Sequence, residues 1–310
     1  MDETGAIGID WGTSSFRAYR LEAGGAVLEV RSAPAGILAV DDGDFEGALE
    51  HLIGDWLDAH AGAPVVLSGM IGSRNGWVEA PYLPCPASLS DLSAGLLPVT
   101  LARGRQIHIA PGVSTRDSGG VPDVMRGEEV QVLGALSSLD DAGPQIACLP
   151  GTHSKWVKVH AGRIEDFSTH MTGEMFDVLR RHSILGRTIE HAAWDDASFL
   201  AGVARSGQPG GFLHHAFGVR ASGLFGELPP ERAGAFLSGL VIGTEIRAAC
   251  QSLEVTDQAP IVLIGDQGLV GLYQSALHHL GMPTEPADRH ATARGLWLLA
   301  EPLQSARGEG

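Results

Sequence analysis

The sequence has few cysteines, and their spacing argues against two kinds of structural framework. Only three of the 310 residues are cysteine: Cys85, Cys148 and Cys250. They are odd in number, widely separated and form no C-x-x-C pair, so neither a disulfide scaffold nor a thiolate zinc site is predicted. A reducing compartment fits this usage. The thirteen histidines include no H-E-x-x-H arrangement that would direct two imidazoles at one metal.

Long apolar runs are also missing. Stretches such as residues 236–243 and 261–265 are far shorter than the roughly 20 residues that span a bilayer. The first apolar stretch, residues 6–9, is too short for the core of a signal peptide, and acidic residues precede it. We therefore expect a cytoplasmic protein that does not associate with membranes.

Basic residues are in deficit. There are 21 Lys and Arg against 37 Asp and Glu, which gives a formal net charge of −16. Nucleic acid would be repelled at long range by such a charge, so it is not an expected partner. ATP is not excluded, because salt screens charges beyond about 8 Å and a nucleotide responds mainly to the donors and metal in its own pocket.

The chain is long enough for two hydrophobic cores. Its 310 residues, 44% hydrophobic and 19% charged, are typical of a folded protein, and two domains of roughly 150 residues each are the starting expectation. Residues 140–144 are polar and rich in turn formers, which suits a boundary. We expect an N-terminal lobe over residues 1–140 and a C-terminal lobe over residues 141–310.

Both halves are predicted to open with a strand, a Gly-Thr turn and a hairpin. The predicted strands are residues 6–10, 15–21 and 26–31, then 145–149, 155–160 and 164–169, with buried strands at 64–67 and 261–264. The predicted helices are residues 45–60, 124–139, 174–182, 197–204, 231–252, 269–280 and about 292–299. Residues 68–111 are rich in Gly and Pro and show few periodic runs. The pattern predicts an α/β fold with mixed sheets.

The first Gly-Thr turn carries residue types that bind phosphate. Asp10 ends a strand, where its carboxylate can orient a water on Mg²⁺, and Arg17 lies on the same strand face as Ser15. The residues expected to donate to phosphate oxygens are Gly12, Thr13, Ser14 and Ser15. A plain hairpin turn is the alternative, since Gly-Thr-Ser is common in turns.

The second Gly-Thr turn repeats the order of the first. Its expected phosphate-binding residues are Gly151, Thr152, His153, Ser154 and Lys155. Neither a Walker A loop nor a G-x-G-x-x-G fingerprint occurs, which disfavours those nucleotide folds. The duplication resembles the superfamily of actin, hexokinase, sugar kinases and chaperone ATPases. This resemblance implies two actin-like (ribonuclease H-like) lobes with mixed five-stranded sheets, with ATP in the cleft between a sugar-acid side and a nucleotide side.

Longer, irregular segments resemble 2-dehydro-3-deoxygalactonokinases, the 2-keto-3-deoxy-galactonokinase family. The segments are residues 66–74 (VLSGMIGSR), 76–77 (GW), 79–82 (EAPY), 123–129 (DVMRGEE), 150–156 (PGTHSKW) and 171–174 (MTGE). The resemblance runs from Ile7 to about Leu299. It implies transfer of the γ-phosphate of ATP, with Mg²⁺, to the terminal C6 hydroxyl of 2-dehydro-3-deoxy-D-galactonate in galactonate breakdown.

Phosphoryl transfer to a hydroxyl calls for a carboxylate that accepts its proton. Asp123 is the first choice because it is predicted to precede a helix, as the catalytic Asp of hexokinase-like kinases does. Asp117 is the second choice. N-capping after Pro122 would explain Asp123 equally well.

A sugar acid also requires a cation, preferably the planar fork of Arg. The residues expected around the substrate are Ser73, Arg74, Asn75, Trp77, Glu79, Tyr82 and Arg126. Arg74 is preferred to Arg126 as the partner of the carboxylate. A solvated loop arginine and a tryptophan packed on the core are the alternatives for Arg74 and Trp77.

Two glycines and three acidic side chains complete the candidates. Gly265 and Gly268, in a strand-to-helix turn, are candidates for the adenosine site, although tight packing explains glycine there equally well. Glu128 and Glu129 suit either charged positions on a helix surface or positions that contact the ligands of a metal ion. Glu174, at a helix start, suits either a mobile cap or simple N-capping.

Two other functions remain open. One is a kinase for another sugar acid, such as 2-dehydro-3-deoxygluconate. The other is a non-catalytic sugar or nucleotide sensor, which is disfavoured because the first strand leaves no room before it for a helix-turn-helix and the chain is acidic. A homodimer is compatible with the sequence, which does not locate its surface.

Overall fold

The computed structural model describes residues 4–137, 143–189, 194–255 and 259–305. The chain divides into two compact units. The first comprises Met1–Pro144, Val159–Asp166 and Ala287–Gly310, and the second comprises Gln145–Lys158 and Phe167–Pro286. Unlike the consecutive lobes expected from the sequence, the first unit includes the C-terminal helix α9 (Ala291–Ser305), because that helix packs on strands and helices of this unit.

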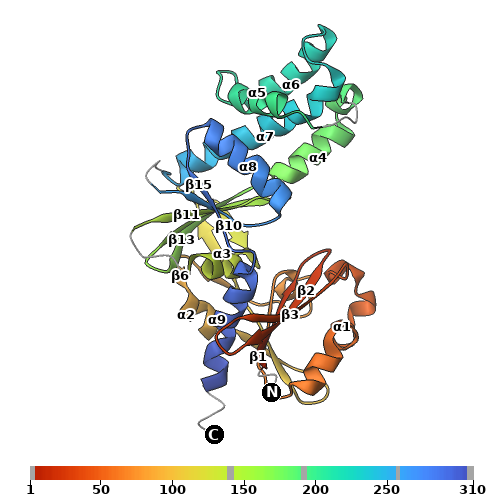
Figure 1. The fold of residues 1–310 in the computed structure, drawn as a ribbon, viewed down its shortest axis with the longest axis vertical. Helices are drawn as coiled ribbons and strands as arrows, with labels where there is room; N and C mark the ends of the chain where they lie inside the picture. Colours follow the sequence, from red (N-terminus) through yellow and green to blue (C-terminus); the bar gives the residue numbers. More distant parts are fainter. Residues whose placement is uncertain (1–3, 138–142, 190–193, 256–258, 306–310) are drawn as a thin grey trace. The chain divides into compact units, whose positions relative to one another are not determined.

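The first unit is built on a six-stranded sheet of order β3-β2-β1-β4-β8-β7 (Figure 1). Its strands are β1 (Thr4–Trp11), β2 (Phe16–Glu22), β3 (Val27–Ala33), β4 (Val65–Ser68), β7 (Leu97–Thr100) and β8 (Gln106–Ile109). β1, β2 and β3 form an antiparallel meander, while β4 runs parallel to β1 and sets Ser68 beside Asp10. The predicted meander and the mixed sheet are confirmed.

Helices of this unit pack on the sheet and on one another. They are α1 (Phe45–Ala59), α2 (Leu89–Ala94), α3 (Glu128–Leu136) and α9, with short 3₁₀ turns η1 (Ile37–Ala39), η2 (Asp41–Gly43) and η3 (Met70–Gly72). Helices α1 and α9 pack on strands of this sheet, whereas α2 and α3 pack on α9. Asp44 caps α1 by accepting a hydrogen bond from the Gly47 N–H at 2.9 Å. Leu49, Ile53 and Trp56 recur at helical spacing on its buried face. The helix predicted over residues 45–60 is therefore confirmed.

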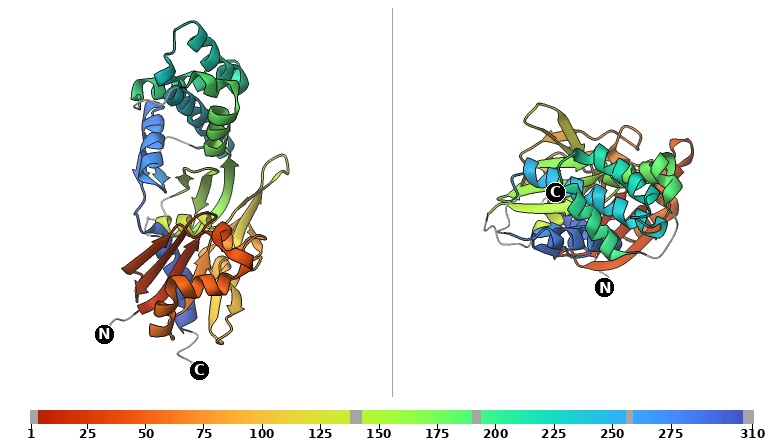
Figure 2. Two further views of the ribbon diagram at one scale, coloured as in Figure 1. Left: turned by 90° about the vertical axis from the view of Figure 1, so that its right-hand side faces the viewer. Right: turned by 90° about the horizontal axis from the view of Figure 1, so that it is seen from above.

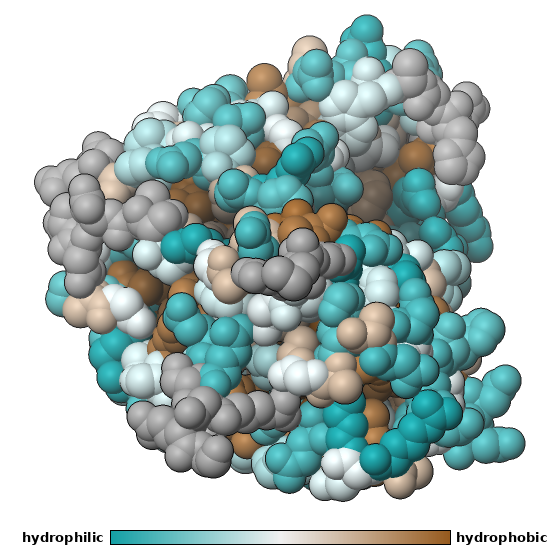
Figure 3. Space-filling model, turned by 60° about the horizontal axis from the view of Figure 1, so that its bottom comes forward, coloured by the Kyte–Doolittle hydropathy of each residue, from teal (hydrophilic) through white to brown (hydrophobic). Residues whose placement is uncertain are grey.

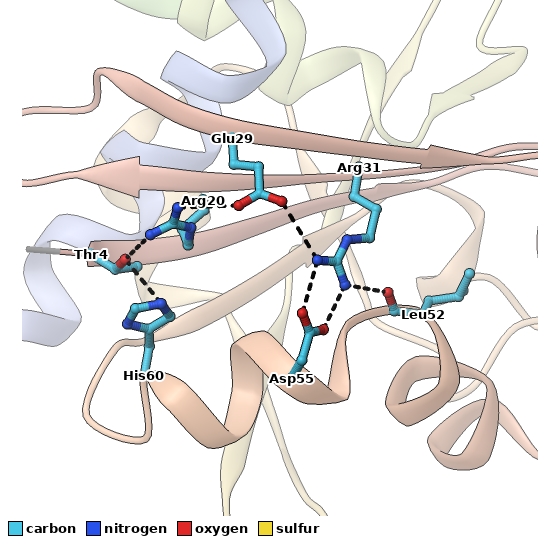
Figure 4. Close-up of polar contacts among 7 residues, drawn as sticks. All are labelled: Thr4, Arg20, Glu29, Arg31, Leu52, Asp55 and His60. Atoms are coloured by element: carbon cyan, nitrogen blue, oxygen red, sulfur yellow. Dashed lines mark hydrogen bonds and ion pairs between the residues drawn. The ribbon is translucent and has the colours of Figure 1, made fainter. Parts of the chain in front are cut away.

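Ion pairs fasten the outer edge of the meander to α1 (Figure 4). Arg31 of β3 bridges to Asp55 of α1 at 2.6 Å and donates to the Leu52 carbonyl at 3.0 Å. Arg20 pairs with Glu29 on the neighbouring strand at 3.1 Å. These side chains lie partly in water, where each pair contributes up to about 1 kcal/mol, so the apolar core holds the unit together.

A smaller sheet of order β10-β9-β5 corrects one prediction. Its strands are β5 (Tyr82–Pro84), β9 (Gly112–Arg116) and β10 (Pro122–Met125). Residues 122–125 are extended, so a helix from residue 124 was wrong, and Asp123 lies within a strand instead of at a helix start. The helix begins only after Gly127, whose φ of +103° no helical residue adopts.

The second unit holds most of a sheet of order β15-β14-β11-β12-β13-β6. Its strands are β6 (Ala87–Ser88), β11 (Gln145–Leu149), β12 (Ser154–His160), β13 (Arg163–His170), β14 (Ile261–Leu263) and β15 (Thr284–Pro286). The tip of the β12–β13 hairpin and β6 are grouped with the first unit. Each large sheet thus has six strands instead of the expected five. The additional edge strand is β7 in the first sheet and β6 in the second, and without these two strands the strand orders of the two sheets match.

Helices dominate the remainder of the second unit. They are α4 (Thr172–His182), α5 (Asp196–Ser206), α6 (Gly211–Leu224), α7 (Pro230–Ser252) and α8 (Gln267–His279), with the 3₁₀ turn η4 (Ile184–Thr188). α5 and α6 pack along α7 (Figure 2). Within the described ranges, α7 is the helix long and apolar enough to cross a membrane, but 67% of its apolar window is buried in the structure, as in a core helix.

The surface drawn in Figure 3 is mostly hydrophilic, with hydrophobic residues in smaller separate groups. The largest side chains with almost no exposed area include Trp11, Phe16, Trp156, Phe199 and Tyr273. These five come from both units, so each unit has its own apolar core.

Candidate active site

The first Gly-Thr turn, residues 12–15, joins β1 to β2. The Gly12 N–H donates to the Ser15 carbonyl at 2.8 Å, and the Gly12 and Thr13 carbonyls accept from the N–H groups of residues 37 and 38 at 3.0 and 3.2 Å. Thr13, Ser14 and Ser15 are exposed. The turn is therefore held through its carbonyls while its hydroxyl side chains face outward.

Asp10 and Arg17 lie directly opposite each other at the base of this turn. Burial raises the pKa of Asp10 to about 6, Arg17 opposes the rise, and Glu128 adds to it. The carboxyl group is consequently mainly ionised at pH 7. Arg17 is exposed, so its cation is available near the turn.

The chain crosses itself closely beside Asp10. Gly69 has a φ of +91°, and a Cβ atom there would lie 2.8 Å from the Trp11 carbonyl oxygen and 3.1 Å from Asp10 Oδ1. Gly127, before α3, lies next to Gly69, with 3.0 Å between its ideal Cβ position and the Gly69 Cα. The start of α3 is thereby brought to Asp10, which explains the effect of Glu128 on the Asp10 pKa.

Glu129 is fully buried at the start of α3. Its Oε2 accepts a hydrogen bond from the Gly127 N–H at 2.7 Å, whereas its Oε1 has no hydrogen-bond partner among the residues that the structure describes. Burial raises the pKa of this carboxyl to about 8, with Glu128 adding to the rise. Glu129 therefore lies inside the protein, and the interpretation as helix-surface charge was wrong.

The two candidate arginines occupy different environments. Arg126 is 7% exposed, donates from Nη2 to the Ala80 carbonyl at 2.7 Å, and stacks 4.3 Å from the ring centre of Tyr82. Its Nε and Nη1 have no hydrogen-bond partner in the part of the chain that the structure describes. The Arg74 side chain is 85% exposed and pairs with Glu79 at 3.5 Å.

Other residues of the 69–80 loop serve packing. Trp77 stacks on Phe45 with the ring planes 19° apart and is packed against the core of the first unit. Ser73 is almost buried, and its hydroxyl donates to the Met70 carbonyl at 2.7 Å. Asn75 is exposed. The alternative that Trp77 packs on the core thus matches its position.

The two candidate bases lie within the β9–β10 hairpin, Asp117 in its turn and Asp123 on β10. Asp123 lies opposite Thr115, is half-buried, and accepts from the Val124 N–H at 2.7 Å. Asp117 is exposed, and its Oδ1 accepts from the N–H groups of Gly119 and Val121, each at 2.9 Å, which closes the hairpin turn. The position of Asp117 is thus explained by turn formation.

The second Gly-Thr turn, residues 150–153, joins β11 to β12. Thr152 and His153 are exposed, but Ser154 and Lys155 are buried. Lys155 donates to the His153 carbonyl at 3.1 Å. This second turn therefore presents two of its expected phosphate-binding side chains to solvent and turns two inward.

The first turn of α4 lies directly against the second Gly-Thr turn. A Cβ atom on Gly173 would lie 2.7 Å from the Gly151 carbonyl oxygen, so only glycine fits. The Glu174 N–H donates to the Thr152 carbonyl at 3.1 Å, and its carboxylate lies 2.5 Å from His153 Nε2. Glu174 thus holds the turn from the α4 side, a role that its sequence position did not indicate.

The candidate adenosine glycines are exposed: Gly265 lies on the loop between β14 and α8, and Gly268 lies at the start of α8. Gly265 has a φ of +143° and lies beside the Pro150 carbonyl, 3.6 Å from its ideal Cβ position. The Gly268 N–H donates to Asp266, which caps α8. Gly265 therefore adjoins the second Gly-Thr turn, and Gly268 lies in the first turn of α8.

A family model described as 2-keto-3-deoxy-galactonokinase matches residues 10–299, which include both Gly-Thr turns. The chain belongs to this family. The resemblance predicted from the irregular segments is thereby confirmed.

Relatives extend the match over nearly the whole chain. The 2-dehydro-3-deoxygalactonokinase of Escherichia coli (strain K12) is 38% identical over 277 residues, which cover 89% of this chain and 90% of that protein. A Rhizobium meliloti (strain 1021) protein, named as a probable enzyme of this kind, is 39% identical over 304 residues, 94% of this chain and 97% of its own.

Solved structures agree on the fold. A crystal structure from Sinorhizobium meliloti, provisionally given the same enzyme name, matches with a TM-score of 0.88 at 37% identity, covering 96% of this chain and 99% of that one. The activator of 2-hydroxyisocaproyl-CoA dehydratase from Clostridium difficile, solved with ADPNP, matches at 0.52 with 13% identity, covering 98% and 97%. The actin-like α/β class expected from the sequence is confirmed.

Proposed function

We propose that the chain transfers the γ-phosphate of ATP to the C6 hydroxyl of 2-dehydro-3-deoxy-D-galactonate, giving the 6-phosphate and ADP in D-galactonate catabolism. The observation that carries this proposal is the family match over residues 10–299. The Escherichia coli relative, 38% identical, is named for this activity. The reaction is placed in the cytoplasm, with a small acid and ATP as partners, in keeping with the acidic chain and its isolated cysteines.

The first Gly-Thr turn is assigned to the transferring phosphate. Its exposed hydroxyls, with Arg17 beside them, are donors suited to phosphate oxygens. Mg²⁺ arriving with ATP would neutralise phosphate charge, and it needs only one or two protein carboxylates because it keeps several waters. Asp10 can supply such a carboxylate. Within the described ranges no group of three His, Cys, Asp or Glu is placed to hold a metal alone, which favours an ion carried by the nucleotide.

The second Gly-Thr turn is assigned to the inner phosphates. Thr152 and His153 are exposed on it. Gly265 lies against the same turn, so the β14–α8 loop is assigned to adenosine.

The substrate carboxylate is assigned to Arg126. Buried donors without partners are costly, and a carboxylate oxygen would satisfy Nη1, one of the two donors of this guanidinium that have no partner among the described residues. The Ala80 carbonyl and the Tyr82 ring hold the guanidinium in place. Exposed Arg74 and Glu79 would lie at the rim, where they can contact hydroxyls.

Asp123 is assigned as the proton acceptor. It is half-buried in the same unit as the first Gly-Thr turn, whereas Asp117 is occupied in closing a turn. Because phosphoryl transfer depends mainly on positioning and charge, loss of this base should lower kcat by about 10²–10⁴-fold without abolishing ATP binding.

The test is a coupled ADP-release assay with Mg·ATP and a panel of 2-dehydro-3-deoxygalactonate, its gluconate epimer and neutral hexoses. Wild type should turn over the galactonate-derived acid selectively, and Asp123→Asn should lose kcat while retaining its affinity for ATP. Preference for the epimer would move the proposal to a 2-dehydro-3-deoxygluconate kinase. ATP binding without turnover of any compound would favour a sensor, and full activity in Asp123→Asn would transfer the base role to Asp117.

A further inference from the structure

A buried chain of polar groups runs from the core of the second unit to the second Gly-Thr turn. Trp156 Nε1 donates to Glu245 Oε1 at 2.7 Å, and the Tyr273 hydroxyl donates to Glu245 Oε2 at 2.5 Å. The Tyr273 oxygen lies 2.9 Å from Ser154 Oγ, which in turn lies 3.4 Å from the Gly151 nitrogen. The chain therefore connects α7, α8 and β12 to the first glycine of the turn.

The hydrogen bonds of this buried network can all be donated in one consistent direction, toward Glu245. Tyr273 gives its proton to Glu245, so Ser154 gives its single proton to the Tyr273 oxygen at 2.9 Å in preference to the Gly151 carbonyl at 3.4 Å, and it can accept from the Gly151 N–H. Burial raises the pKa of Tyr273 well above its ordinary value, with Glu245 adding to the rise, so the phenol keeps its proton. Each member of the chain is thus satisfied at the cost of one fixed orientation of Ser154.

The cost of such a network suggests a purpose beyond stability. A carboxylate and two hydroxyls in a core stabilise no more than apolar groups of the same shape would. Trp156, Ser154 and Tyr273 are no more than 1% exposed, so they do not meet solvent or ligand directly. Glu245 is 4% exposed and borders a pocket lined by residues of β13, α4 and α7. What the network does contact is the Gly151 backbone, whereas Glu174 holds Thr152 and His153.

We propose that Tyr273 and Glu245 are positioning residues that hold the second Gly-Thr turn, through Ser154, in the conformation that receives the inner phosphates of ATP. The inference rests on the proposed function of that turn. Ser154 then acts inside the protein as a relay, and only the outward face of the turn, at Thr152 and His153, contacts phosphate.

The test compares Tyr273→Phe, Ser154→Ala and the double variant in steady-state kinetics, well below their melting temperatures. Tyr273→Phe keeps the ring but removes the link, so the KM for ATP should rise about 5–30-fold, while the KM for the sugar acid stays within about twofold. Because the two residues act in series, the double variant should be no worse than the poorer single variant.

Thr244→Val is the matched control. Thr244 adjoins Glu245 on α7, and its hydroxyl donates only within its own helix, to the Leu240 carbonyl at 2.7 Å. Loss of that bond should leave both KM values unchanged. A purely structural role for Tyr273 would show itself as a lower melting temperature with an unaltered KM for ATP, and that result would overturn the proposal, as would additive effects of the two single variants.

Direct ATP binding by calorimetry separates this inference from the proposed function. If wild type phosphorylates no sugar acid but binds ATP, and Tyr273→Phe weakens that binding at least fivefold, the positioning role stands and the assigned reaction falls. If wild type is active and ATP binds equally to wild type and Tyr273→Phe, the reaction stands and the positioning role is wrong.

Discussion

Replacement of Arg126 by methionine tests the assignment of the substrate carboxylate. The methionine keeps an unbranched, apolar stem in a place where the arginine is 7% exposed, and it removes the charge. A hydrogen bond to a charged group contributes about 1.5–3 kcal/mol net, which corresponds to about a 10–150-fold change in affinity. The KM for the sugar acid should rise by that factor, and the KM for ATP should change little.

Folding of the variant is expected to survive. The change loses the bond to the Ala80 carbonyl and the contact with the Tyr82 ring, but it also removes two buried N–H groups without hydrogen-bond partners in the described residues. Both effects are of the order of 1–3 kcal/mol and opposite in sign. Thermal unfolding should therefore shift by only a few degrees.

The matched variant is Arg74→Met. Arg74 is 85% exposed, and its 3.5 Å pair with Glu79 is worth at most about 1 kcal/mol. Steady-state kinetics of both variants with the acid and with its uncharged amide should show a large loss only for Arg126→Met with the acid. A large loss in Arg74→Met together with normal kinetics in Arg126→Met would show that Arg74, and not Arg126, binds the carboxylate.

Three further perturbations follow from the groups around Asp10. Burial holds the pKa of Glu129 at about 8, above its ordinary 4.5, so at intermediate pH the folded state binds a proton that the unfolded state releases. The free energy of unfolding should therefore fall as pH rises from about 4.5 to 8. In denaturant titrations Glu129→Gln should flatten this slope, and an unchanged slope would contradict the burial of the carboxyl group. The pKa of Asp10, about 6, should appear as the acidic limb of kcat/KM and vanish in Asp10→Asn, so a limb that persists there belongs to another group. Gly69→Ala should destabilise the protein by about 1–3 kcal/mol, because residue 69 has a φ of +91° and the new Cβ would lie 2.8 Å from the Trp11 carbonyl oxygen. Unfolding curves that overlay those of wild type would contradict this strain.

Local sequence patterns predicted the parts of the fold that repeat over many residues. In β1 the alternation of Ile7, Ile9 and Trp11 matches the buried face of the sheet, and α1 shows its apolar stripe at helical spacing. The short elements between residues 68 and 111, two to six residues each, carry too few repeats for a pattern. α6 was missed because Leu213 and Phe217 on it are exposed, which obscures its buried face.

The candidate site was predictable in residue type but not in burial. Ser154 belongs to the second Gly-Thr turn by sequence, but its side chain faces Tyr273, which is 119 positions away. The contrast between Arg126 and Arg74 likewise depends on Ala80 and Tyr82, which tertiary packing brings to Arg126. Asp123 was predicted to precede a helix because Val124 and Met125 fit a helical pattern as well as a strand. The positive φ of Gly127 is incompatible with a helix that continues through that residue.

The proposed reaction is the esterification of one hydroxyl of one sugar acid. Its most direct test is ¹³C and ³¹P NMR of the product formed by wild type from Mg·ATP and 2-dehydro-3-deoxy-D-galactonate. A single phosphate ester whose phosphorus couples to C6, formed in equal amount with ADP, is the predicted result. A phosphate on another oxygen, or release of inorganic phosphate with the acid unchanged, would contradict the proposed transfer to the C6 hydroxyl.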